Sequence, residues 1–388
     1  MKRSRPPLIV SGMLAGDPYQ GGAAWAVLQY VLGLRRLGYN VYLIEPVAAK
    51  ALRPTGTQFA VSENATYFRA VIRAYGLDRR SSLVLEGSNE TAGLPYPELR
   101  KISADAVGLI NISGMLRRQD LIGNIPIRVY LDLDPGFNQL WHATQGIDMR
   151  FSAHNRFVTV GNALGDADCL VPVCGIQWTT TFQPVVLEYC TVANRVFFDG
   201  FTTVANWRGY GSIEHNGVHY GQKAHSLRKF MDLPTKTSEK FMMALSIHPG
   251  ECQDLTALSS NGWRLVDPLR VASTPKKYLR FIGGSKAEFG IAKSGYVAAR
   301  SGWFSDRSAC YLASGRPVIA QDTGFGKYLP CGEGLFPFQT ADDALAAIEE
   351  INVDYARHST AAHAIANEYF ESGKVLSKLL TAVGLTND

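Results

Sequence analysis

The chain has 388 residues, of which 46% are hydrophobic and 19% charged. This length predicts two domains, and this composition is typical of a globular protein rather than a disordered one. A formal net charge of +5 is too small to indicate nucleic-acid binding by itself, although it suits an anionic partner. No apolar run approaches the roughly 20 residues of a membrane span.

The cysteines and the first residues bear on the compartment. The six cysteines form no C-x-x-C pair and have no histidines nearby at zinc-binding spacing. We therefore expect reduced thiols and a cytoplasmic protein. Residues 2–10 resemble a signal peptide only superficially, because the apolar part is short and no A-x-A site follows. We interpret them as a basic tail and a first strand.

The first part of the chain predicts a complete βαβ unit. It contains a buried strand, a glycine-rich loop, an amphipathic helix and a second strand, over residues 7–11, 12–22, 23–37 and 41–44. Gly38 closes the helix as a left-handed cap. Glu45 ends the second strand, where a ribose-binding acid would stand in a dinucleotide-binding protein. The loop lacks the G-x-G-x-x-G spacing, so a nicotinamide-dependent oxidoreductase is kept as an alternative only.

Short apolar strands with polar carboxyl ends continue through the first half, over residues 106–111, 127–132, 157–160 and 169–171. Repeated alternation of strands and helices predicts a doubly wound α/β domain. A fresh strand over 201–204 begins a second domain, and later strands are expected near 241–246 and 279–282. We place the junction near residues 193–197. The predicted divisions are residues 1–195, 196–365 and a last helix over 366–388.

Candidate catalytic residues lie at strand ends and in the first loop. Asp132 and Asp134 follow the strand over 127–132, where a carboxylate can act as general base, although Asp-Pro-Gly is also a strong turn signal. Asp134 is the preferred candidate. His154 is a second candidate, since imidazole titrates near neutral pH. Asp17, in the first loop, is a third.

Residues 301–324 are the most informative stretch. They predict a loop, a short helix, a Gly-Arg-Pro turn, a buried strand and a second polar loop. Ser305 can cap the helix, which leaves free N–H groups and the positive end of the helix dipole facing the loop. Such a helix start suits a phosphate or diphosphate, and Arg307 would add a charged fork beside it. After the strand, Gln321 and its neighbours stand at the carboxyl end, where ligands bind in open α/β sheets.

This order of helix, Ala-x-Gly-x-Pro turn, strand and polar loop resembles the donor half of the GT-B glycosyltransferases, most specifically over residues 280–375. The resemblance implies an α/β fold of two Rossmann-like, doubly wound domains that face each other across a cleft. It also implies an acceptor in the first domain, a UDP-, GDP- or dTDP-linked sugar in the second, and a last helix that crosses back. No cofactor and no metal are expected, because Asp132 and Asp134 mimic the D-x-D of metal-dependent transferases in a context that fits a GT-B sheet end better.

The resemblance also assigns site residues. Ser305, Asp306 and Arg307 would bind the diphosphate, and Arg208 would be a second phosphate contact. Lys293 would neutralise the leaving group, where negative charge grows. Further donor contacts are expected at Gly284, Ser285, Gln321, Asp322, Thr323 and Gly324, and the paired glycines Gly21 and Gly22 would line the cleft. Cys310 stands where many retaining members carry a glutamate, so the stereochemistry is left open.

The acceptor and the alternatives stay open at this point. A small molecule, a glycan or a lipid-linked acceptor is expected, the last with a peripheral membrane location. A nucleic-acid acceptor would need one basic patch made of Lys2, Arg3, Arg5, Arg79, Arg80, Arg117 and Arg118. Alternatives to the transferase are a sugar-nucleotide epimerase, the oxidoreductase and a non-catalytic binding module. The oligomeric state is not indicated.

Overall fold

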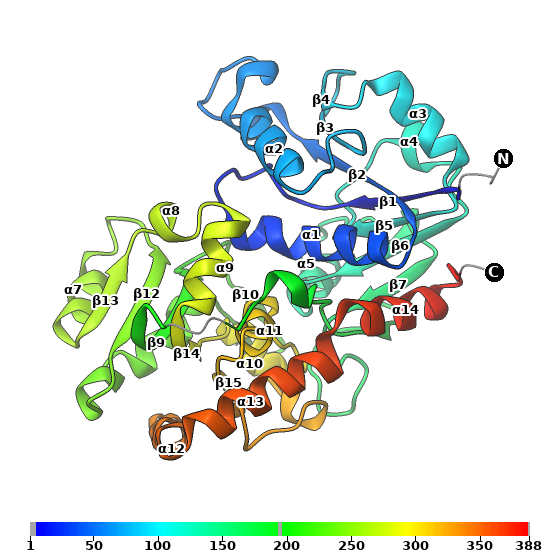
Figure 1. The fold of residues 1–388 in the computed structure, drawn as a ribbon. Coiled ribbons are helices and arrows are strands. Elements are labelled where there is room, and N and C mark those ends of the chain that lie inside the picture. Colours follow the sequence, from blue (N-terminus) through cyan, green and yellow to red (C-terminus); the bar gives the residue numbers. More distant parts are fainter. Residues whose placement is uncertain (1–4, 193–195, 387–388) are drawn as a thin grey trace.

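Two mainly parallel sheets, each covered by helices, organise the chain (Figure 1). A computed structural model describes residues 5–192 and 196–386. Within these residues the first sheet has the order β4-β3-β2-β1-β5-β6-β7-β8, and the second has the order β13-β12-β9-β14-β15-β16. The predicted α/β architecture of two Rossmann-like halves is confirmed. The predicted junction near 193–197 includes residues 193–195, which lie outside the described residues.

The first half consists of strands that are buried because helices cover both faces of the sheet. Its strands are β1 (Pro7–Ser11), β2 (Asn40–Val47), β3 (Ser81–Leu85), β4 (Thr91–Gly93), β5 (Gly108–Ile112), β6 (Ile127–Asp132), β7 (Arg156–Thr159) and β8 (Thr179–Thr180). Its helices are α1 (Gly21–Arg36), α2 (Glu63–Ala74), α3 (Tyr96–Asp105), α4 (Gln119–Ile122) and α5 (Phe137–Thr144). Neighbouring strands are parallel, except for the antiparallel pair β3 and β4.

The second half repeats this plan around a second core. Its strands are β9 (Phe198–Asn206), β12 (Phe241–Ser246), β13 (Trp263–Val266), β14 (Ser285–Gly290), β15 (Val318–Gln321) and β16 (Leu335–Phe338), with a separate hairpin of β10 (Ile213–His215) and β11 (Val218–Tyr220). Its helices are α6 (Lys223–Leu227), α7 (Cys252–Ser260), α8 (Pro268–Val271), α9 (Pro275–Gly283), α10 (Ser294–Ala299), α11 (Asp306–Ala313), α12 (Ala341–Val353) and α13 (Tyr355–Ile365).

Two strands expected from the sequence are not formed. Residues 279–282 belong to α9, because the Thr274 side chain caps the helix by accepting from the Lys277 N–H and Pro275 occupies its first turn. Residues 169–171 are not a strand either. The Leu170 N–H instead donates to the Ala299 carbonyl of the second half at 3.0 Å. These segments are therefore set by a helix cap and by a contact between the halves.

The last helix, α14 (Ser372–Val383), lies against α1 of the first half (Figure 1). A side chain at Gly33 of α1 would meet Leu376, since an added Cβ would lie 2.5 Å from that leucine. The entry to the helix is fixed by the Val185 N–H, which donates to the Phe370 carbonyl at 2.6 Å. The chain end thus spans both halves. No helix within the described residues is long and apolar enough to cross a membrane.

The start of α1 touches the second half directly. The Gly21 N–H donates to the Ala272 carbonyl at 3.0 Å, and a Cβ at Gly21 would lie 2.4 Å from the carbonyl oxygens of Ala272 and Thr274. A Cβ at Gly22 would lie 2.9 Å from the Tyr278 ring. Backbone approaches this close admit no side chain at Gly21.

We expect Gly21→Ala to lower the free energy of unfolding by about 1–3 kcal/mol. The added methyl group would overlap the backbone of Ala272 and Thr274, which can move away only if the contact between the two halves is disrupted. Gly211→Ala is the matched control, since Gly211 is exposed and nothing lies within 4 Å of its added Cβ. The control should stay within about 0.5 kcal/mol of wild type. Urea unfolding measures both, and equal effects would contradict the close contact.

Candidate active site

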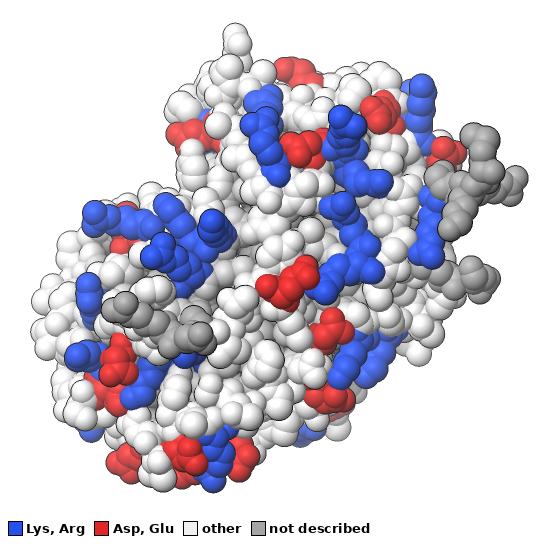
Figure 2. All heavy atoms as spheres, in the orientation of Figure 1, with Lys and Arg blue, Asp and Glu red and all other residues white. Residues whose placement is uncertain are grey.

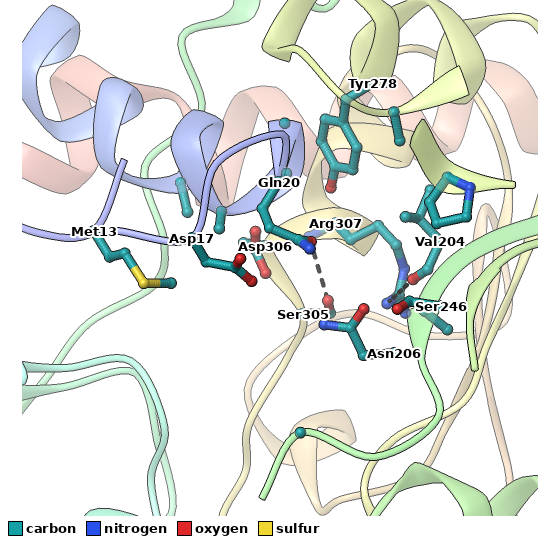
Figure 3. Close-up of a pocket in the computed structure, with 18 of the residues that line it drawn as sticks. Met13, Asp17, Gln20, Val204, Asn206, Ser246, Tyr278, Ser305, Asp306 and Arg307 are labelled. Atoms are coloured by element: carbon teal, nitrogen blue, oxygen red, sulfur yellow. Dashed lines mark hydrogen bonds between the residues drawn. The ribbon is translucent and has the colours of Figure 1, made fainter. Parts of the chain in front are cut away.

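A cavity of about 910 Å³ lies between the two halves. The first half contributes the loop after β1, the start of α1 and the loop after β6. The second half contributes the carboxyl ends of β9 and β12, the start of α6 and the start of α11. Figure 3 shows Asp17 and Gln20 from the first half near Asp306 and Arg307 from the second. The cavity therefore lies where the carboxyl ends of two parallel sheets meet.

Glu45 fixes the loop after β1 through hydrogen bonds to its backbone. Its fully buried carboxylate accepts the Ala15 N–H at 2.8 Å and the Gly16 N–H at 2.6 Å. Burial raises the pKa of this carboxyl to about 8, and the hydrogen bonds from the loop backbone oppose that rise. Glu45 does not line the cavity, unlike the ribose-binding acid that the dinucleotide alternative requires. The loop that it holds does, through Met13, Asp17 and other residues.

The start of α11 opens into the cavity as the sequence predicts. The Ser305 side chain accepts the Arg307 N–H at 3.2 Å and so caps the helix. Asp306 also lines the cavity, and burial raises the pKa of its carboxyl. Arg307 is 9% exposed and pairs with the fully buried Glu288 at 2.5 Å. The charge of the predicted phosphate-binding arginine is thus already matched by a carboxylate.

Lys223, at the first position of α6, lines the cavity and was not singled out from the sequence. Its ammonium group donates to the Ile291 carbonyl at 2.5 Å. Burial lowers the pKa of Lys223 well below its ordinary value, and the charge of Arg307 lowers it further. The sequence contains one indication that Lys223 binds an anion. A lysine in the first turn of a helix is unfavourable next to the positive end of the helix dipole, unless an anion lies beside it.

Asp134 and Lys293 meet inside the cavity, from opposite halves. The ammonium of Lys293 lies 3.2 and 3.1 Å from the two carboxylate oxygens of Asp134. The hydroxyls of Tyr210 and Tyr296 donate to the same carboxylate. Burial, followed by the charge of Asp134, raises the pKa of both tyrosines well above the ordinary value. The tyrosines therefore stay protonated donors.

Asp132 has a structural role. Its buried carboxylate accepts from the side chains of Asn138 at 2.6 Å, Gln139 at 2.8 Å and Thr159 at 2.8 Å. It also accepts the Asp134 N–H at 3.0 Å, which forms the turn that presents Asp134 to the cavity. Of the two aspartates in the predicted turn, only Asp134 lines the cavity.

The structure brings together part of the predicted site. The predicted residues that line the cavity are Asp17, Gly21, Gly22, Asp134, Lys293, Ser305, Asp306 and Arg307. His154 is not among them. It borders a separate cavity of about 210 Å³, and its ring donates to the Arg150 carbonyl and accepts from Asn111. Burial lowers its pKa. A role for His154 in the main cavity thus lacks the expected geometry.

Three residues predicted on the donor side do not line the cavity. Arg208 does not line the cavity; its side chain is 40% exposed and pairs with Glu251 at 2.5 Å. Gly284 follows α9 and Ser285 begins β14, so both lie at the amino edge of the sheet instead of the carboxyl edge. The error follows from taking residues 279–282 as the strand.

The polar loop after β15 also lies outside the main cavity. Gln321 accepts the Ala292 N–H at 3.3 Å, and Asp322 accepts the Gly324 N–H at 2.8 Å. The hydroxyl of Thr323 donates to the Trp303 carbonyl at 2.5 Å. Thr323 also accepts the Gly302 N–H through its carbonyl at 2.8 Å, so it joins this loop to residues 301–304. Gln321, Asp322, Thr323 and Gly324 do not line the main cavity, although Gln321 borders a small pocket together with Ser305 and Arg307. Their predicted contact with the sugar stays a prediction.

No protein-family model matches the chain, and no curated protein matches it significantly. Solved structures do. An α-glucosyltransferase in complex with UDP-glucose and DNA containing an abasic site is 11% identical, covers 98% of this chain and 99% of its own, and superposes with a TM-score of 0.61. HepE from Anabaena, in complex with UDP-glucose, is 11% identical, with 98% and 100% covered and a TM-score of 0.60. AviGT4, a glycosyltransferase involved in avilamycin A biosynthesis, is 12% identical, with 98% and 97% covered and a TM-score of 0.57. The chain therefore has the GT-B fold, as its sequence predicts.

The buried carboxyl of Glu45 predicts a stability that depends on pH. Its pKa in the folded state, about 8, lies above the ordinary value of 4.5. The contribution of Glu45 to the free energy of unfolding is therefore fully present below pH 4.5 and is lost as pH rises toward 8. The loss is at most about 1.4 kcal/mol per pH unit. Glu45→Gln removes this titration. Urea unfolding at pH 5 and pH 8 should show wild type losing stability relative to the variant.

The exposed carboxyl of Glu86, which follows β3, serves as the control for this measurement. Glu86→Gln should follow wild type at both pH values. A Glu45→Gln variant that also follows wild type would show that the Glu45 carboxyl does not titrate in this range.

Proposed function

We propose that this protein is a glycosyltransferase that moves a sugar from a nucleotide-sugar to an acceptor hydroxyl, without a metal ion. The observation that carries the proposal is the cavity between the two halves, into which a capped helix start and Lys223 both project. Free N–H groups at a helix start and a nearby cation suit a diphosphate. The known structures with this fold and with bound UDP or UDP-glucose support the same assignment.

Lys223 is the cation best placed to bind the diphosphate. Arg53, Lys293 and Arg307 also line the cavity, but each pairs with a carboxylate, from Asp17, Asp134 and Glu288 respectively. Lys223 instead donates to a backbone carbonyl. A diphosphate beside it would favour the charged ammonium that burial disfavours. The donor would therefore gain from Lys223 an interaction that no carboxylate of the protein already supplies.

The nucleoside end of the donor has an apolar wall beside these groups. Leu245, Ile247 and Leu269 line the cavity near the carboxyl ends of β12 and β13. A uracil, guanine or thymine base can pack there while its diphosphate reaches Lys223 and the start of α11. We propose UDP-sugars first, because the similar solved structures contain UDP or UDP-glucose.

The acceptor would enter from the first half, where Asp17 and Asp134 line the cavity. Either carboxylate could accept the proton of an acceptor hydroxyl, because both face the same space as the donor groups. The expected acceptors are a small molecule, a glycan or a lipid-linked sugar. All six cysteines are free, which supports a reducing, cytoplasmic location.

A nucleic-acid acceptor is the second candidate. Four of the similar structures contain DNA, and Figure 2 shows a group of basic side chains over α8 and α9 of this chain. The patch predicted from the sequence is a different one and stays a prediction: Arg118 pairs with Asp120, and Lys2 and Arg3 lie outside the described residues. Duplex DNA binding that weakens steeply between 50 and 200 mM salt would favour this candidate.

The alternatives differ in their products. An epimerase would convert a nucleotide-sugar alone into its isomer, whereas a transferase releases the nucleoside diphosphate when an acceptor is present. An oxidoreductase would be stabilised by a nicotinamide cofactor. A binding module would bind the donor without turnover.

We expect Lys223→Met to weaken UDP binding by about tenfold or more, because one charge-assisted hydrogen bond to phosphate is lost. The measurement is calorimetric titration of UDP, GDP and dTDP into each protein. Arg208→Ala is the control, since Arg208 does not line the cavity. Arg307→Ala is a poor probe, because it would leave the buried Glu288 without its partner and destabilise the fold. Equal binding by Lys223→Met and Arg208→Ala would contradict the assignment of Lys223.

A further inference from the structure

In the ion pair of Asp134 and Lys293, every N–H of the lysine ammonium already has an acceptor within the protein. An ammonium has three N–H donors. Lys293 has acceptors for all of them: the Asp134 carboxylate, the Tyr210 hydroxyl and the Tyr296 hydroxyl, the last at 3.3 Å. Both tyrosines in turn donate to Asp134. The two charged side chains are 22% and 23% exposed, so they are partly open to the cavity.

A diphosphate entering this cavity can contact Lys293 only by displacing one of these acceptors. The three acceptors are not equivalent. The tyrosine hydroxyls are neutral, because burial raises the pKa of each. The carboxylate of Asp134 is the acceptor whose negative charge would repel the diphosphate. It comes from the opposite half, on the loop after β6.

We propose that the donor diphosphate and the Asp134 carboxylate compete for Lys293, so that donor binding releases Asp134 toward the acceptor. This inference rests on the proposed function. In the donor-free protein Asp134 is held by three donors and is poorly placed to take a proton. Once Lys293 turns to the diphosphate, the strongest of these donors is gone. The acceptor would then meet a carboxylate without its charged partner only when the donor is already bound.

The competition predicts opposite signs for two substitutions in one cavity. Asp134→Asn removes the competing charge, so UDP should bind about threefold to tenfold more tightly, as expected for a partly buried ion pair. Lys293→Met removes the shared cation, so UDP should bind more weakly. The double variant should resemble Lys293→Met, because Asp134 acts on UDP through Lys293. Calorimetric titration of UDP measures all four proteins.

Asp168→Asn is the charge-matched control. Asp168 pairs with Lys327 outside the cavity, so its loss changes the net charge equally and should leave UDP affinity unchanged. If Asp134→Asn does not fold, Asp134→Ser removes the same charge and keeps a hydroxyl that can accept from the tyrosines. An Asp134 variant that binds UDP as the control does, or more weakly, overturns the inference while the proposed function stands. A wild-type protein that binds none of UDP, GDP and dTDP overturns the proposed function, and this inference with it.

Discussion

The direction of parallel strands is the constraint from which the site follows. In a parallel sheet all carboxyl ends lie at one edge, and here the two sheets turn these edges toward one cavity. Loops after β1 and β6 meet loops after β9 and β12 for this reason. The close backbone contact at Gly21 and the return of α14 to α1 hold the edges together. A cavity built in this way has two chemically different walls, one from each half.

Charge balance decides what the cavity can bind. Most of its cations face a carboxylate of the protein, and Arg307 with Glu288 is the most deeply buried of these pairs. Such pairs are costly to break, since a buried charge without its partner destabilises the fold. Lys223 differs because its partner is a neutral carbonyl. Lys293 is intermediate, since its partner Asp134 is partly exposed and can be exchanged.

Two buried carboxyl groups of the first half each fix a loop through hydrogen bonds. Glu45 and Asp132 are both buried and accept several donors each, and each one fixes a loop of the first half. Neither lines the cavity. They shape the first half's wall of the cavity by holding the loops that carry Asp17 and Asp134. A carboxylate at the end of a buried strand is therefore as easily a support for a loop as a reacting group, and only its neighbours distinguish the two.

The sequence alone determined what depends on short-range interactions. Strand and helix alternation predicted the α/β halves, and Ser305 was recognised as a cap because the cap and the N–H it accepts are two residues apart. Tertiary structure decided the rest. The partner of Lys293 comes from position 134, the hairpin of β10 and β11 separates Lys223 from β9, and the loop at 321–324 folds onto residues 301–304. Apolar periodicity alone can also mislead. The pattern of residues 279–282 fits a strand and a buried helix equally well, and the cap at Thr274 makes them helical, which places Gly284 at the amino end of β14. Helix caps and periodicity depend on residues that are close in sequence. Charge pairing across a cleft depends on which distant chain segments the fold brings together.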